Sequence, residues 1–260
     1  SSDVCSSDLL VYNMEPEVSK WLHDNGIHTC ITDTTNSDST RWRSHTKSVV
    51  VDRFFDAYKL LSLYEYDRAV ITDVKDVVFQ RDPFSTEYDD LHKHNIIAGC
   101  EGLKYHQESW GWNNINLSFG ALISKSMENE LIVCAGVMAG DARTLADLCL
   151  QIYAMSHMAP SYRIPGGGGP DQAAYNIILR QAIYRPHVTI PPHAASWAVQ
   201  LGTVGPHVSH YHPNLDPQWA PPVITQDGLV LPFDGSLPFA MVHQYDRIPE
   251  WKHLIEERYK

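Results

Sequence analysis

The sequence predicts an α/β protein with an open, mostly parallel sheet. Short β-branched runs alternate with longer amphipathic segments along most of the chain, the strand-helix order typical of such folds. One run, Ala69 to Thr72, is apolar throughout, as expected of a strand covered on both faces. At 260 residues with 43% hydrophobic composition, the chain has enough material for one domain with a full core.

Each element follows from local periodicity and from turn residues. The predicted strands are 10–12, 27–31, 69–72, 96–99 and 117–124. The predicted helices are 17–24, 50–64, 128–138, 142–156 and 171–182. The first helix ends at the turn pair Asn25-Gly26, and the second carries Phe54, Tyr58 and Leu61 on one face. From about residue 200 the helical patterns give way to prolines, histidines and tryptophans. We therefore expect residues 200–260 to close over the candidate active face and not to form a second domain.

Composition limits the possible partners. The chain has 20 basic and 31 acidic side chains, a formal charge of -11, so nucleic acid is not an expected partner. No apolar run reaches the roughly 20 residues of a membrane-spanning helix. Five cysteines without paired spacing are typical of reduced thiols in a cytoplasmic protein. We predict that Cys134 and Cys149 are small core residues.

The first nine residues do not fit the alternation of strands and helices that follows them. SDVCSSDL, Ser2 to Leu9, is polar and lacks the basic and apolar regions of a signal peptide. It resembles the translation of a common sequencing adapter, a known contaminant of assembled metagenomes. We therefore expect 1–9 to be a non-native leader, with an ordinary polar tail as the alternative.

Acidic residues gather at the end of the apolar strand, in the stretch AVITDVKDVVFQRDPF, residues 69–84. In open α/β sheets, ligands bind beyond the carboxyl ends of the strands, where Asp73 and Asp76 are expected. Carboxylates so close together repel each other unless a cation or hydrogen-bond donors hold them ionised. Mg²⁺ or Mn²⁺ with a diphosphate suits such ligands, while a helix cap or surface turn explains the spacing equally well.

Three segments in order resemble a known family. DRFFDAYKLLSLYEYDRAVITDVKDVVFQRDPF, residues 52–84, resembles the central segment of GT-A-fold glycosyltransferases, and most of all a bacterial and viral group with the motif TDVRDVVFQ-DPF. GGGGPDQAAYNIIL, residues 166–179, resembles that group's G-x-DQ-x-x-x-N motif. DGLVLPFDGSLPFAMVHQYDRIPEW, residues 227–251, resembles its VHQYDRHPE ending. Three ordered matches are far more specific than D-x-x-D alone.

The resemblance implies a metal site. Asp73 and Asp76 correspond to the acidic metal-binding motif, although its usual form is D-x-D. His243 corresponds to a C-terminal histidine ligand, with a buried core histidine as the alternative. The implied cofactor is Mn²⁺ or Mg²⁺. Arg53 and Lys75 are candidates to offset the charge of a nucleotide diphosphate.

Further residues are implied around the sugar. Asp171 is the candidate catalytic carboxylate, although an aspartate at a helix start also satisfies free amides. The adjacent Gln172 and, one turn further on, Asn176 are candidate substrate-binding residues, and Asn176 would support Asp171. Trp110 and Trp112 are candidate stacking surfaces for a sugar, with plain core packing equally open. Asn116 resembles an asparagine in the corresponding strand of the family. Three further histidines, at positions 207, 210 and 212, fit a histidine-rich loop better than a zinc cluster.

The implied function is metal-dependent transfer of a sugar from a nucleotide-diphosphate donor to the hydroxyl of a glycan or other acceptor. The GT-A-like domain is expected to span 10–260 and to lack its first strand. Two alternatives remain: a non-catalytic carbohydrate-binding protein on a decayed transferase fold, and a nucleotidyltransferase. The intact Asp73, Asp76, Asp171 and His243 argue against a decayed site, which would lose its ligands first. A nucleotidyltransferase is the closer alternative, and its usual glycine-rich, basic signature would lie in the N-terminal part that this chain is expected to lack.

Overall fold

The computed structural model describes residues 8–12, 15–32, 49–160, 168–192, 195–204 and 221–259. The strands are β1 (Asp8–Tyr12), β2 (His28–Thr32), β3 (Arg68–Thr72), β4 (Val77–Phe79), β5 (Ile96–Lys104), β6 (Leu131–Asp141), β7 (Val188–Thr189), β8 (Ala198–Gln200), β9 (Val223–Ile224), β10 (Val230–Leu231) and β11 (Met241–His243). The α-helices are α1 (Pro16–Asp24), α2 (Val49–Leu63), α3 (Ser109–Phe119), α4 (Ala121–Met127), α5 (Ala142–His157), α6 (Asp171–Leu179), α7 (Leu201–Val204) and α8 (Pro249–Arg258).

The central sheet is mixed, and the prediction of a mostly parallel sheet is wrong. Its order is β3-β6-β5-β7. β6 runs antiparallel to both β3 and β5, and only β5 and β7 are parallel. The direction of a strand in a sheet depends on which distant segments pair with it. The local periodicity of the sequence does not show which segments pair. The long strand β6 is the spine of the sheet, because β3 and β5 hydrogen-bond to its two edges.

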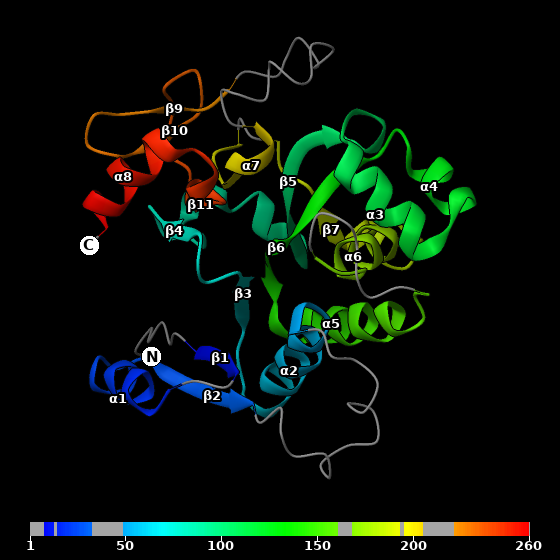
Figure 1. Cartoon of the computed structure of the whole chain (residues 1–260), viewed down its shortest axis with the longest axis horizontal. Helices are drawn as coiled ribbons and strands as arrows, with labels where there is room; N and C mark the ends of the chain where they lie inside the picture. Colours follow the sequence, from blue (N-terminus) through cyan, green and yellow to red (C-terminus); the bar gives the residue numbers. More distant parts are fainter. Residues whose placement is uncertain are drawn as a thin grey trace.

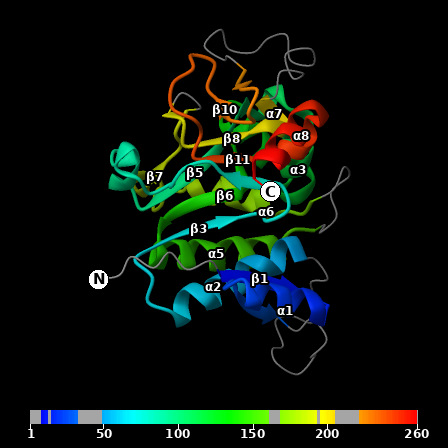
Figure 2. The same cartoon turned by 90° about the vertical axis from the view of Figure 1, so that its left-hand side faces the viewer.

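Both faces of this sheet are covered (Figure 1, Figure 2). On one face, α2 and α5 pack with α6 against Ile96, Ala98 and Met138. On the other face lies a second sheet of order β4-β11-β8, whose Met241 packs near Ile97. Figure 2 shows the helices α2 and α5 below the central strands and β8 and β11 above them. Burial on both faces explains why the central strands are nearly continuous apolar runs.

Two predicted elements are wrong. Residues 128–138, predicted as a helix, contain most of β6, and residues 117–124, predicted as a strand, form the end of α3 and the start of α4. Both are short apolar runs, which periodicity alone cannot assign to helix or strand. The two helices meet at Gly120, whose φ of 88° falls in the region that glycine adopts without strain.

The other predicted elements are confirmed within a few residues at their ends. These are the strands at 10–12, 27–31, 69–72 and 96–99 and the helices at 17–24, 50–64, 142–156 and 171–182. β1 and β2 form a separate parallel pair in the part of the chain that the structure describes. β1 begins at Asp8, within the predicted leader, whose first seven residues lie outside the described ranges, as do Gly166, Gly167 and the three histidines of 205–220. Within the described ranges, no helix has the length and apolar character needed to cross a membrane.

Helix α6 is tied to the spine strand by one buried side chain. Asn176, fully buried, donates to the carbonyl oxygen of Val133 at 2.7 Å and accepts from its backbone N–H at 2.9 Å. The carboxamide of Asn176 therefore bonds both backbone polar groups of Val133, as a neighbouring strand would. The contact fixes the height of α6 against the sheet, and with it the position of the residues at the helix start.

We expect Asn176→Ala to lower the free energy of unfolding by about 3 kcal/mol, because it leaves the N–H and C=O of Val133 buried without partners. Chemical denaturation with urea would measure this loss. The exposed Asn113→Ala in α3 is the matched control and should change stability by no more than about 0.5 kcal/mol. Equal stability of the two variants would contradict the role given to Asn176.

Candidate functional site

Three predicted metal ligands converge. Asp73, Asp76 and His243 each offer one ligand atom, and these atoms all lie within 4.8 Å of one another. His243 Nε2 is 3.5 Å from Asp73 Oδ2 and 3.6 Å from Asp76 Oδ1. The imidazole is 2% exposed, while the Asp73 side chain is 36% exposed and so open to an incoming ligand. Two carboxylates and an imidazole are a suitable donor set for a divalent cation, so the cluster could hold a metal ion.

Backbone pairing brings these residues together. Asp73 directly follows β3, and its N–H donates to the carbonyl oxygen of Gly136 on β6 at 3.0 Å. In the second sheet, β11 runs antiparallel to β4, which sets His243 opposite Val77, the residue after Asp76. The N–H of Gln244 then donates to the carbonyl oxygen of Asp76 at 2.8 Å. The C-terminal strand thus delivers the imidazole to the carboxylates.

The lack of a side chain at Gly136 provides the space in which Asp73 and His243 approach each other. A Cβ added at this position would lie 2.6 Å from Cε1 and 3.0 Å from Nε2 of His243, and 2.8 Å from Asp73 Oδ2. Real Cβ atoms do not approach other heavy atoms so closely. A side chain on β6 at this point would therefore push the imidazole and the carboxylate apart.

Arg53 links two parts of the site. From α2 its guanidinium bonds Asp73 Oδ1, and its other terminal nitrogen lies 3.2 Å from Asp171 Oδ2. Burial alone would raise the pKa of Asp73, but its contacts with the His243 ring and with the guanidinium of Arg53 outweigh this and hold that pKa well below its usual value. Asp73 is therefore ionised at neutral pH, with Oδ2 facing the imidazole.

Asp171 lies at the start of α6, as predicted. The residue is 6% exposed, and burial raises the pKa of its carboxyl group although the charge of Arg53 opposes this. The next residue, Gln172, accepts from the N–H of Ala135 at 3.3 Å and donates to Glu101 Oε1 at 3.0 Å. The start of α6 thus faces the same stretch of β6 as the metal cluster.

Glu101 belongs to this group and was missed in the sequence, because the predicted strand stopped at Gly99. It lies in β5, 4% exposed, beside the Cys134 thiol, which in turn is 3.5 Å from His243 Nδ1. Burial and the charge of Glu108 raise the pKa of Glu101 to about 7, and the hydrogen bond from Gln172 only partly offsets this. In the sequence, a single glutamate directly after the apolar run 96–100 is the feature that could have indicated this residue. Cys134 and Cys149 are both buried core residues, as predicted, and Cys134 also contacts the His243 ring.

The remaining predicted residues lie in varied surroundings, and their binding roles stay predictions. Lys75 is exposed in the loop between the two aspartates. The ring of Trp110 faces Gly168, and Trp112 packs against a buried apolar cluster of α3, α4 and α6. Asn116 accepts from the Ser124 hydroxyl at 3.2 Å, across the α3–α4 corner. Asn176 is committed to β6, as described above.

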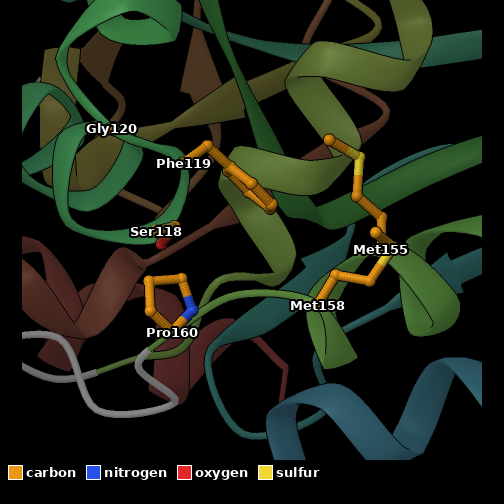
Figure 3. Close-up of a pocket in the computed structure, with 6 residues that line it drawn as sticks. All are labelled: Ser118, Phe119, Gly120, Met155, Met158 and Pro160. Carbon is orange, nitrogen blue, oxygen red and sulfur yellow. The ribbon is translucent and has the colours of Figure 1, made fainter.

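Figure 3 shows an apolar pocket beside that corner. It is lined by residues of α3 and α5 and of the segments that directly follow these helices: Ser118, Phe119, Gly120, Met155, Met158 and Pro160. None of them belongs to the metal cluster or to the group around Asp171. This pocket is therefore a feature separate from the candidate site.

Comparison with known proteins identifies the fold. No protein-family model matches the chain, and no curated protein matches it. Its structure resembles that of galactosyltransferase LgtC in complex with donor and acceptor sugar analogues, with a TM-score of 0.52, 13% sequence identity, and coverage of 97% of this chain and 84% of that one. The fold resembles GT-A. A mouse xyloside xylosyltransferase 1 in its apo form also matches, with a TM-score of 0.41, 12% identity, and coverage of 91% and 82%.

We expect Gly136→Ala to weaken Mn²⁺ binding by about tenfold or more, because the added methyl displaces the imidazole and one carboxylate, and to lower stability by about 1–3 kcal/mol through overpacking. Calorimetric titration and thermal unfolding would measure the two effects. Gly26→Ala is the control for metal binding: its methyl meets nothing within 4 Å, so Mn²⁺ affinity should be unchanged. Its φ of 75° strains an alanine, so this variant also shows what a loss of stability without crowding does to metal binding. Wild-type Mn²⁺ affinity in a folded Gly136→Ala protein would contradict the proposed crowding.

Glu101 should make stability depend on pH. Its pKa is about 7 in the folded protein against about 4.3 when unfolded, so between these values the folded state binds the extra proton and stability falls as pH rises. The penalty reaches about 3 kcal/mol above pH 7 and vanishes below about pH 4. We expect Glu101→Gln to remove this decline, as measured by urea unfolding from about pH 4.5 to 7.5. Parallel pH curves for wild type and variant would contradict the raised pKa.

Proposed function

We propose that this chain is a metal-dependent glycosyltransferase that moves a sugar from a nucleotide-diphosphate donor to an acceptor hydroxyl. One observation carries the proposal: Asp73 and Asp76, from one loop, and His243, from a strand near the other end of the chain, bring their ligand atoms within 4.8 Å of one another on a fold that resembles GT-A. The donor set matches what Mn²⁺ or Mg²⁺ takes when phosphate oxygens complete its shell.

Asp73, Asp76 and His243 would hold the cation in this proposal. When bound, the cation would offset the negative charge that grows on the leaving nucleotide diphosphate. Asp73 suits this role because Arg53 occupies one of its oxygens and leaves the other facing His243. The exposed Lys75, between the two aspartates, would contact the diphosphate from the solvent side.

The start of α6 would bind the sugar. Arg53 contacts both Asp73 and Asp171, so the two carboxylates lie on either side of one guanidinium. In this proposal Asp171 would accept a hydrogen bond from a hydroxyl of the donor or acceptor. Its burial raises its pKa and makes it a stronger base than an exposed aspartate. In a transfer with inversion at the sugar carbon, Asp171 would take the acceptor proton. Gln172, held by Ala135 and Glu101, would contact the sugar beside it.

A donor screen tests the proposal. Each common nucleotide sugar would be incubated with the protein with and without Mn²⁺, and released nucleotide diphosphate would be measured. We expect metal-dependent hydrolysis or transfer for at least one donor, with loss of about a hundredfold or more in Asp73→Asn and His243→Ala. In addition, His243→Ala should weaken the Mn²⁺ dependence.

Asp90→Asn is the matched control, because Asp90 is an exposed aspartate whose ion-pair partner in the described ranges is the exposed Lys93. It should keep wild-type activity. Turnover that persists in Asp73→Asn at the wild-type rate would remove the proposed metal site from the reaction. An absence of nucleotide release and of donor binding across the whole screen would contradict the proposed activity.

A further inference from the structure

The two ring nitrogens of His243 face different surroundings. Nε2 faces the carboxylates of Asp73 and Asp76 at 3.5 and 3.6 Å. Nδ1 faces the opposite way and contacts the side-chain oxygen of Gln200 at hydrogen-bond distance. The Cys134 sulfur is a second and longer neighbour of Nδ1, at 3.5 Å. What Nδ1 bonds decides where the ring carries its proton, and so whether Nε2 can bind a cation.

Strand pairing sets this contact. β8 and β11 run parallel with His243 directly opposite Gln200, so the two side chains are neighbours in the sheet. Both are buried, Gln200 completely. The space that its carboxamide occupies exists because residue 99 is a glycine: a Cβ there would lie 2.8 Å from Gln200 Nε2. The structure therefore reserves room for a polar side chain behind the imidazole.

The amide nitrogen of Gln200 makes no favourable polar contact with the described residues. Among the described residues, Gln200 Nε2 has no hydrogen-bond partner although it is buried, and leaving such a group unpaired is unfavourable. An apolar side chain of similar size would avoid that cost. The polar contact that the Gln200 carboxamide makes is between its oxygen and Nδ1 of His243, so this contact accounts for a polar side chain at residue 200.

We propose that Gln200 is a positioning residue of the metal site: its carbonyl oxygen accepts the Nδ1–H of His243 and leaves Nε2 as the nitrogen that binds a cation. The inference deepens the proposed function and rests on it only for the identity of the bound ion. With the amide reversed, Nδ1 would have to accept and the proton would remain on Nε2, where it excludes a cation. Metal-bound histidines commonly donate their second N–H in this way, and losing that partner typically weakens metal binding 10–100-fold.

The test compares Gln200→Leu with Gln200→Glu by calorimetric Mn²⁺ titration of the full chain. We expect Gln200→Leu to bind Mn²⁺ about 10–100-fold more weakly, because Nδ1 loses its acceptor. Gln200→Glu should bind within a few fold of wild type, because its carboxylate still accepts from Nδ1–H. Gln80→Leu is the matched control: among the described residues, the Gln80 carboxamide bonds to the backbone of Val230 and Phe239 and to no metal ligand, so its loss should lower stability and leave Mn²⁺ affinity unchanged.

A second readout keeps this inference separate from the proposed function. The ring ¹⁵N shifts of His243 in metal-free protein at about pH 8 should show a protonated Nδ1 in wild type and in Gln200→Glu, and lose that signature in Gln200→Leu. If wild-type protein shows an unprotonated Nδ1, or if Gln200→Leu binds Mn²⁺ as tightly as wild type, the positioning role is refuted. If wild type keeps Nδ1 protonated but binds no Mn²⁺, the proposed metal-dependent function fails while the Gln200 contact stands. Gly99→Ala, which crowds the carboxamide, provides an independent variant and should also weaken Mn²⁺ binding.

Discussion

The candidate site depends on one steric constraint, the lack of a side chain at Gly136. The central strand β6 runs between the end of β3 and the second sheet, and at Gly136 it binds the backbone of Asp73 while it passes against the ring of His243. Any larger residue would separate the two. Because the carboxylate and the imidazole come from different sheets, their approach is a property of how those sheets pack, and Gly136 is the point at which the packing permits it.

Charge balance is the second condition. Asp73, Asp76 and Asp171 bring three carboxyl groups to one region, against the guanidinium of Arg53. Arg53 reaches Asp73 and Asp171 at once, and it also approaches the carbonyl oxygen of Ala135 at 3.4 Å. A planar guanidinium suits this because its donors point in several fixed directions. Arg53 thus couples helix α2 to the site, and Asp76 and the second oxygen of Asp73 remain available to a cation.

Sequence reasoning located some of this arrangement and missed the rest for physical reasons. Asp73 and Asp76 follow an apolar strand, and strand ends are where such sheets place their ligands. His243 was found only through family resemblance, because β11 is three residues long and has no periodicity of its own. Gly136 lies in a run predicted as a helix, so nothing pointed to its role. The mixed direction of the sheet, like the pairing of His243 with Gln200, arises from contacts between distant segments.

The buried layer behind the imidazole shows why a metal-ligand list is an incomplete description of this site. Gln200 contacts His243, Cys134 lies between His243 and Glu101, and Glu101 accepts from Gln172, which adjoins Asp171. Polar side chains thus connect the ring of His243 with the start of α6 beneath the surface. A buried polar layer is costly unless its members bond one another, and each bond then restricts the others to one geometry. The orientation of the imidazole and the position of Gln172 therefore depend on the same set of contacts. A substitution at Glu101 or Gln200 should alter the geometry of both side chains.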